Sequence, residues 1–95
     1  MNEIRRKYLR NVVKCLRDME NEALSTAHEM LEDAANEEEE MRDAMPENLQ
    51  GSDRYCDSEE ASDYMEQALS AMDDITSSIA DAIEALESIP KVAEQ

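Results

Sequence analysis

The chain contains no phenylalanine or tryptophan, and it has only one glycine and one histidine. Leucine, isoleucine and valine together number 15 among 95 residues, which excludes a thick globular core. A single glycine cannot build a glycine-rich phosphate-binding loop. One histidine and two cysteines also fall short of the four ligands that a structural zinc site usually needs. We therefore expect neither an enzyme nor a protein with a resident metal or other cofactor.

The two cysteines, Cys15 and Cys56, are not arranged as a C-x-x-C pair. The first 20 residues hold a basic stretch and no apolar run of the length that an export signal or a membrane-spanning helix needs. These features predict a cytoplasmic protein with reduced thiols, and an intermolecular disulfide is the alternative.

Basic residues are also scarce, with nine against 25 acidic ones, for a net charge of −16. Few large apolar residues together with high net charge are typical of disorder. The chain is nevertheless rich in the helix formers Ala, Glu, Leu, Met and Arg. It lacks the β-branched and aromatic clusters that are typical of strands. The sequence therefore predicts an all-α fold.

Apolar periodicity predicts a first helix over residues 2–45, approximately. Steps of 4, 4 and 3 residues give a row that is apolar at most positions: Ile4, Tyr8, Val12, Cys15, Met19, Ala23, Thr26, Met30, Ala34, Glu37, Met41 and Met45. A flanking row widens this surface: Leu9, Val13, Leu16, Leu24, Ala27, Leu31 and Ala35. The repeat of 11 residues favours an irregular bundle over an ideal coiled coil.

A second helix is predicted over about residues 52–89, with Ser52 as its N-cap and Pro90 beyond its end. Steps of 4 and 3 residues give a four-heptad row: Ala61, Met65, Ala68, Met72, Ile75, Ile79, Ala82, Leu86 and Ile89. Between the helices, residues 46–51 are expected to form one helical turn that starts at Pro46 and ends with a left-handed Gly51. With a short tail at 90–95, the chain is predicted to be a single helical-hairpin domain of two long antiparallel helices.

Two such helices cannot cover the wide apolar surface of the first one, which predicts self-association into a coiled-coil or four-helix arrangement. The residues expected at this contact are Val13, Leu16, Leu24, Leu31, Ile75, Ile79 and Leu86. Charge supports an antiparallel hairpin, because residues 1–20 carry a net charge of +3. Folding back would bring them beside Asp81, Glu84 and Glu87.

Acidic side chains gather on both sides of the predicted turn and form what we call the acidic cluster. Its members are Glu37, Glu38, Glu39, Glu40, Asp43, Glu47, Asp53, Asp57, Glu59, Glu60 and Asp63. One interpretation is a solubilising surface. The other is a binding site for a basic protein groove that normally holds nucleic-acid phosphates, so that the protein would act as an inhibitor by occupation. The same charge argues against direct nucleic-acid binding. A membrane is not expected as a partner, because no membrane-spanning segment is predicted.

Two patterns in the sequence are compared below with known metal sites: the residues around His28 and the acidic segment that follows the predicted turn. His28 with Glu29 and Glu32 suggests a metal site, but a di-iron bundle needs two Glu-x-x-His pairs, and position 25 is a serine. A calcium loop of the EF-hand type needs a central glycine that "DRYCDSEEASD" lacks. We therefore expect His28 to be an ordinary polar residue.

The segments "EEEEMRDA" and "MPENLQGSDRY" resemble small acidic proteins of phages and mobile elements of Gram-positive bacteria. The resemblance covers Glu37 to Glu66 and implies a helical hairpin with no catalytic residues to carry over. A phage origin would favour an accessory role, such as inhibition of a CRISPR effector or a restriction enzyme by nucleic-acid mimicry. The alternative function is a structural or scaffold coiled-coil oligomer whose acidic surface keeps it in solution.

Overall fold

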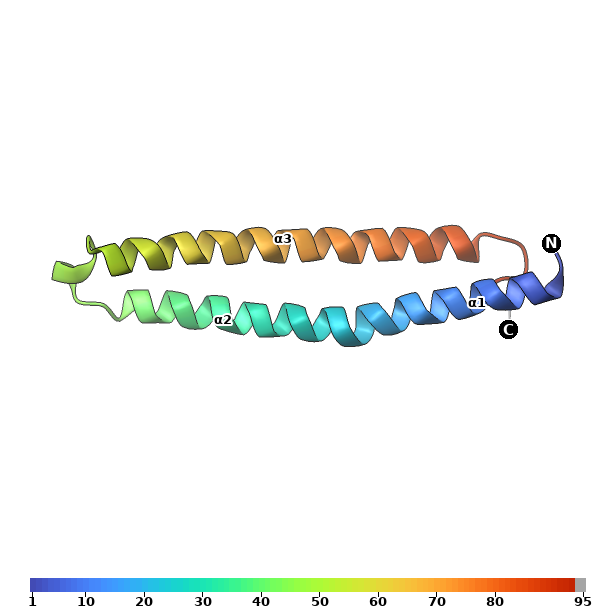
Figure 1. The fold of residues 1–95 in the computed structure, drawn as a ribbon, viewed down its shortest axis with the longest axis horizontal. Coiled ribbons are helices and arrows are strands. Elements are labelled where there is room, and N and C mark those ends of the chain that lie inside the picture. The colour runs from blue at the N-terminus through green and yellow to red at the C-terminus, as the bar shows by residue number, and fades with distance from the viewer. Residues whose placement is uncertain (94–95) are drawn as a thin grey trace. The chain divides into compact units, whose positions relative to one another are not determined.

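The computed structural model describes residues 1–93, and all of their regular structure is helical (Figure 1). The elements are the α-helix α1 (Glu3–Asp18), the π-helix η1 (Met19–Leu24), the α-helix α2 (Ser25–Asp43), the 3-10 helix η2 (Glu47–Leu49) and the α-helix α3 (Asp53–Glu87). No strand occurs among these residues, which confirms the all-α prediction. Of the predicted tail at 90–95, Glu94 and Gln95 lie outside the described residues.

Packing divides the chain into two compact units. Unit 1 joins Met1–Thr26 to the segment from Asp73 onward, and unit 2 is Ala27–Met72. In each unit, a stretch of the first helical segment lies beside a stretch of α3 that runs in the opposite direction (Figure 1). The organisation of the chain as a single domain stays a prediction.

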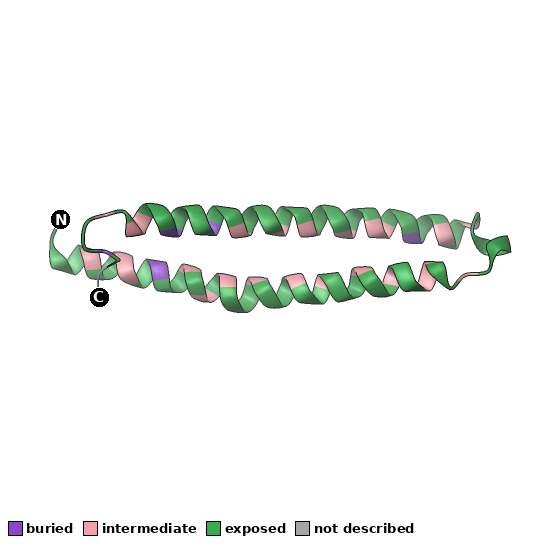
Figure 2. Ribbon diagram, turned by 180° about the vertical axis from the view of Figure 1, so that it is seen from behind, coloured by how far each residue is buried: buried purple, intermediate pink, exposed green. Residues whose placement is uncertain are grey.

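Unit 1 has an apolar core in which Val13 of α1 meets Ile79 and Ile83 of α3. Three half-buried leucines pack against it: Leu16, Leu24 and Leu86. Burial is confined to a narrow strip of each helix (Figure 2). Five of the seven residues that were expected to mediate self-association therefore belong to the apolar core of unit 1 or pack against it, namely Val13, Leu16, Leu24, Ile79 and Leu86. Of the other two, Leu31 is half-buried in unit 2 and Ile75 is exposed in unit 1.

The choice of the main packing row on the first helix was wrong, because the flanking row is the packed one. Ile4 and Tyr8, which begin the other row, are 76% and 72% exposed. The physical reason is the spacing of the residues in each row. A heptad row on α3 can stay in contact over several turns only with a row on the first helix that repeats at the same spacing. Leu9, Val13 and Leu16 keep that spacing, whereas successive steps of four residues drift around the helix.

On α3 the heptad spacing is confirmed, but three of the nine predicted positions are exposed. The residues buried or half-buried at steps of 4 and 3 are Ser58, Ser62, Met65, Leu69, Met72, Thr76, Ile79, Ile83 and Leu86. The expected Ala68, Ile75 and Ala82 are exposed, and Leu69, Thr76 and Ile83 beside them are the packed residues. Three of these positions are serine or threonine, so the row could not be recognised from apolar residues alone. Leu69 and Ile83 also bury more apolar area than alanine can.

A π-helical segment, Met19–Leu24, follows α1. The Ser25 N–H bonds to the carbonyl of Glu20, five residues earlier, which is the π-helical spacing. Before this segment, residues that are buried or half-buried recur seven residues apart, as Val13 and Glu20 do. After it they again recur seven residues apart, as His28 and Ala35 do. From Glu20 to His28 the step is one residue longer than a heptad. The predicted period of 11 residues is thus replaced by two heptad stretches joined by one additional residue.

The predicted turn is confirmed in position but not in all of its geometry. Ser52 caps α3, because its hydroxyl accepts a hydrogen bond from the Tyr55 N–H at 3.3 Å and donates one to the Leu49 carbonyl at 2.6 Å. Pro46 precedes the 3-10 turn Glu47–Leu49. The prediction that Gly51 is left-handed was wrong, since the only positive φ among the described residues is that of Lys91, at 70°. The Gln50 N–H already closes the turn on Glu47, so no left-handed residue is needed there.

The basic N-terminal stretch binds the end of α3 within unit 1, as its charge predicted. Arg17 Nη2 lies 2.7 Å from Glu87 Oε1. Arg10 donates instead to backbone carbonyls, to Val92 from Nε at 3.2 Å and to Lys91 from Nη2 at 2.7 Å. Arginine is suited to satisfying the carbonyl groups that remain free where a helix ends. Of the three predicted acidic partners, Asp81 and Glu84 are exposed.

Glu3 joins two arginines at the start of α1. Arg10 Nη1 is 2.9 Å from Glu3 Oε1 and Arg6 Nε is 3.0 Å from Glu3 Oε2. These hydrogen bonds, that of Arg10 first, hold the pKa of Glu3 below its ordinary value. The Glu3 carboxylate therefore stays ionised and keeps both guanidinium groups oriented along the helix.

We predict that Ile79→Ala lowers the free energy of unfolding by about 2–3 kcal/mol, because it removes a large side chain from the core of unit 1. Ile75→Ala is the matched control on the same helix and should change it by no more than about 0.5 kcal/mol. Ile79 is 6% exposed and Ile75 is 47% exposed. Urea denaturation followed by circular dichroism measures both, and equal losses would contradict the assignment of the packed row.

Candidate functional site

Unit 2 holds most of the negative charge of the protein. Its residues, Ala27–Met72, include 15 acidic side chains but only Arg42 and Arg54 as basic ones, for a net charge of −13. All eleven members of the acidic cluster lie in this unit, on α2, on η2 and on the first turns of α3. Ten of them are exposed, and only Glu38 is half-buried. The structure thus brings the predicted residues into one unit and leaves nearly all of them accessible.

Arg42 is the residue that joins α2 to α3 inside this unit. Its Nη1 donates to the carbonyl and to the Oγ of Ser58, each at 3.0 Å, and also to the Oγ of Ser62. Ser58 Oγ in turn donates to Glu38 Oε1 at 2.7 Å. Hydrogen bonds that involve a charged group are stronger than neutral ones, and a partly buried site strengthens them further.

Polar contacts therefore contribute to the packing of the two helices of unit 2, beside half-buried apolar side chains such as Leu31 and Leu69. Ser58, at 4% exposed, is the only buried residue in Ala27–Met72, every residue of which is described. A buried hydroxyl is stable only if its hydrogen bonds are made, and Arg42 and Glu38 make them. Because these bonds fix which residues of α2 and α3 face each other, they also fix where the carboxylates of the acidic cluster stand.

The contact of Arg42 with α3 was not predicted from the sequence. The sequence feature that could have indicated this contact is the pair Ser58 and Ser62. These two hydroxyl residues lie one helical turn apart at heptad positions of α3. Polar residues at such positions indicate a partner on the facing helix. Glu38 was predicted to contact a partner protein, whereas one of its oxygens accepts a hydrogen bond within the chain.

A recess of about 510 Å³ lies at the turn of unit 2. We call it the turn recess, and its lining residues are Met41, Ala44, Met45, Pro46, Leu49, Ser52 and Arg54. Met41 and Met45, which border the turn, are half-buried here, and Leu49 is 46% exposed. The most acidic part of the chain thus also carries an accessible apolar surface.

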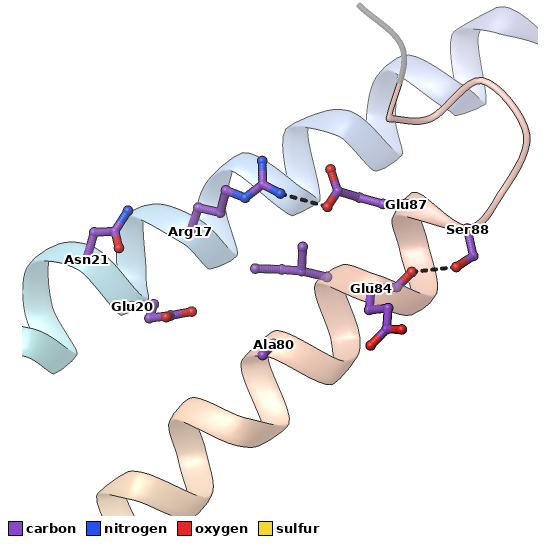
Figure 3. A pocket seen from close by; sticks show the side chains of 8 residues that line it. Arg17, Glu20, Asn21, Ala80, Glu84, Glu87 and Ser88 are labelled. Carbon is purple, nitrogen blue, oxygen red and sulfur yellow. Dashed lines mark hydrogen bonds and ion pairs between the residues drawn. The ribbon is translucent and has the colours of Figure 1, made fainter.

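A hollow of about 480 Å³ in unit 1 lies beside the π-helix (Figure 3). Arg17 points toward Glu87 across it, and Ser88 Oγ donates to the Glu84 carbonyl at 2.8 Å. Glu20 and Asn21 approach from η1 and Ala80 from α3. Its one basic side chain, Arg17, is paired with Glu87, so this hollow lies at a contact that holds α1 to α3.

The remaining chemically active groups of residues 1–93 are scattered along the helices. No three His, Cys, Asp or Glu side chains in this range are placed to hold a metal ion. His28 Nδ1 lies 2.6 Å from Glu32 Oε1, one turn along the same helix. Both cysteines are free and exposed. Of the helices in the described part, none is long and apolar enough to cross a membrane.

Comparison of the chain with models of protein families, with curated proteins and with solved structures finds no match in any of the three. The charge, the accessible surfaces and the contacts described above are therefore the features that can indicate a function. Among these, the acidic cluster and the turn recess of unit 2 are the features that the packing of the helices leaves unexplained.

We predict that Arg42→Met loosens unit 2, because it leaves the Ser58 hydroxyl and carbonyl without their donor. The loss should be about 1–3 kcal/mol, measured by hydrogen exchange of the backbone amides of residues 55–65. Arg54→Met removes the same charge from an exposed position and should change protection by no more than about 0.5 kcal/mol. If both variants lowered protection equally, the effect would come from charge and not from the contact with Ser58.

Proposed function

We propose that the protein is a non-enzymatic binding protein whose acidic cluster occupies a basic, nucleic-acid-binding surface of another protein. The observation that carries this proposal is the placement of ten exposed carboxylates on one unit with a net charge of −13. Within the described residues, only Glu38 of the cluster has its carboxylate in a hydrogen bond. Like charges kept close together and unpaired lower stability, and a basic partner would offset that loss.

The chemistry of the partner follows from the chemistry of the cluster. Carboxylates that project from helices can stand in for the phosphates of a nucleic acid in a groove lined by lysine and arginine. Such a protein would inhibit by occupying the groove, and its binding would weaken as salt concentration rises. The resemblance to phage proteins extends the proposal to a host defence enzyme, of the CRISPR or restriction type, in the bacterial cytoplasm.

The test neutralises four exposed acids, Glu37→Gln, Glu39→Gln, Glu40→Gln and Asp43→Asn, and keeps Glu38 because it bonds to Ser58. The control neutralises four exposed acids of unit 1: Glu22→Gln, Asp74→Asn, Asp81→Asn and Glu84→Gln. We expect the wild type and the control to retain nucleic-acid enzymes from a bacterial lysate, to release them when duplex DNA is added, and to inhibit them.

The variant neutralised in unit 2 should lose both retention and inhibition. The proposal is wrong if no basic protein is retained by the wild type, or if the two fourfold variants behave alike. Repeating the capture at low and high salt separates charge-driven binding from apolar adhesion, because only the former is screened.

A self-associating scaffold is the second candidate, and an exposed row on α1 that continues to the first residue of η1 favours it. This outer row consists of Ile4, Tyr8, Val12, Cys15 and Met19, all of which are exposed. Continuous apolar surface of this kind usually marks an interface. We propose that a second copy of the chain covers this row. The reason is that the spacing of its apolar residues is nearly the same when the helix is followed in either direction.

An antiparallel pair of α1 helices centred between Asn11 and Val12 would place Ile4 opposite Met19 and Tyr8 opposite Cys15. The same register sets Arg5 opposite Asp18, which adds an attraction between opposite charges. A two-fold interface requires a surface that is complementary to itself, and this row meets that requirement. It would replace the contact first expected from Val13, Leu16 and Leu24, which pack inside unit 1.

We predict that Tyr8→Glu converts a dimer to a monomer, because it puts a charge into the middle of the proposed interface. Tyr64→Glu makes the same change at an exposed tyrosine of unit 2 and should leave the dimer intact. Light scattering after size exclusion measures both molar masses. A monomeric wild type, or a dimer that survives Tyr8→Glu, would rule out this interface.

A further inference from the structure

We infer that the turn recess takes up one large apolar side chain from the basic partner, so that recognition combines an apolar anchor with the acidic cluster. This inference rests on the proposed function and names the partner's chemistry more closely. The expected ligand is a protein segment that presents an aromatic or long aliphatic side chain among lysines and arginines.

The size and lining of the recess fit such an anchor. Its volume of about 510 Å³ falls within the range of about 300–1,000 Å³ that is common for ligand sites. Met41, Met45, Leu49 and Pro46 supply the apolar surface. Methionine side chains are flexible and polarisable, which lets them adapt to the shape of an incoming side chain.

The charge around the recess selects the partner. Glu40, Asp43, Glu47 and Asp53 each adjoin a lining residue in the sequence, and all four are exposed. An apolar side chain flanked by acidic residues would be repelled here, whereas one flanked by lysine or arginine would be attracted. The turn of a second copy of the chain is disfavoured as the occupant, because it carries the same charge. An anionic lipid surface is disfavoured for the same reason.

Arg54 is the only basic residue among those that line the recess. A guanidinium beside an apolar recess can lie over the face of an aromatic ring, and it cannot pair favourably with the lysines that flank the anchor. This favours an aromatic anchor over an aliphatic one. In protein interfaces, exposed charges mainly set the rate of association and a buried anchor mainly sets the rate of dissociation. We therefore expect the acidic cluster to govern association and the turn recess to govern dissociation.

The experiment uses the full chain and two synthetic peptides that are rich in lysine and arginine. One has a central phenylalanine, and the other has alanine at that position. We expect the phenylalanine peptide to bind about tenfold more tightly at physiological salt, as is typical for one well-placed anchor. Fluorescence anisotropy of labelled peptides measures both dissociation constants.

Leu49→Ser should abolish the difference between the two peptides and leave the salt-dependent binding of the alanine peptide unchanged. Leu49 is partly exposed and outside the core, so this change should not unfold the protein. Tyr64→Ser, at an exposed tyrosine of unit 2 that does not line the recess, is the matched control and should preserve the difference.

The outcomes separate this inference from the proposed function. If both peptides bind equally and binding weakens with salt, the recess is not an anchor site, while the acidic cluster still binds basic protein. The same conclusion holds if Leu49→Ser leaves the tenfold difference intact. If neither peptide binds, both the inference and the proposed function are overturned.

Discussion

The hydrogen bonds of Arg42 to Ser58 and Ser62 determine which residues of α2 and α3 face each other in unit 2. Ala27–Met72, all of which is described, has no fully buried apolar side chain, so these two helices depend on polar contacts as well as on half-buried apolar side chains. A guanidinium has several donors in a fixed plane, and it can bond to a carbonyl and two hydroxyls at once. Because this contact lies inside the helix pair, the outer faces are free to carry carboxylates, and the negative charge accumulates there.

The two units obtain their stability in different ways. Unit 1 buries Val13, Ile79 and Ile83 and pairs its basic helix with Glu87 and with the backbone that follows α3. Unit 2 has polar contacts and a strong excess of one charge. Regions that bind partners are often drawn from the less stable parts of a fold, and this distribution is consistent with a binding role for unit 2.

Local signals in the sequence predicted the helices well, since Ser52, Pro46 and the helix-forming composition act over only a few residues. The acidic cluster was also predictable, because charge can be counted. What could not be predicted was which row of the first helix packs, because periodicity shows that apolar residues recur but not what they face. Contacts such as that of Arg42 with Ser58 join residues 16 positions apart and depend on the register of two helices. The left-handed residue was placed at Gly51 by composition, whereas the structure has it at Lys91.

The π-helix at Met19–Leu24 has a consequence for how such a chain can change over time. A wide turn absorbs one residue while the heptad positions before and after it keep their spacing. A gene that gains or loses a single codon here would not have to rebuild the pattern on either side. The segment therefore marks a place where the length of this protein can vary by one residue without a new set of core residues.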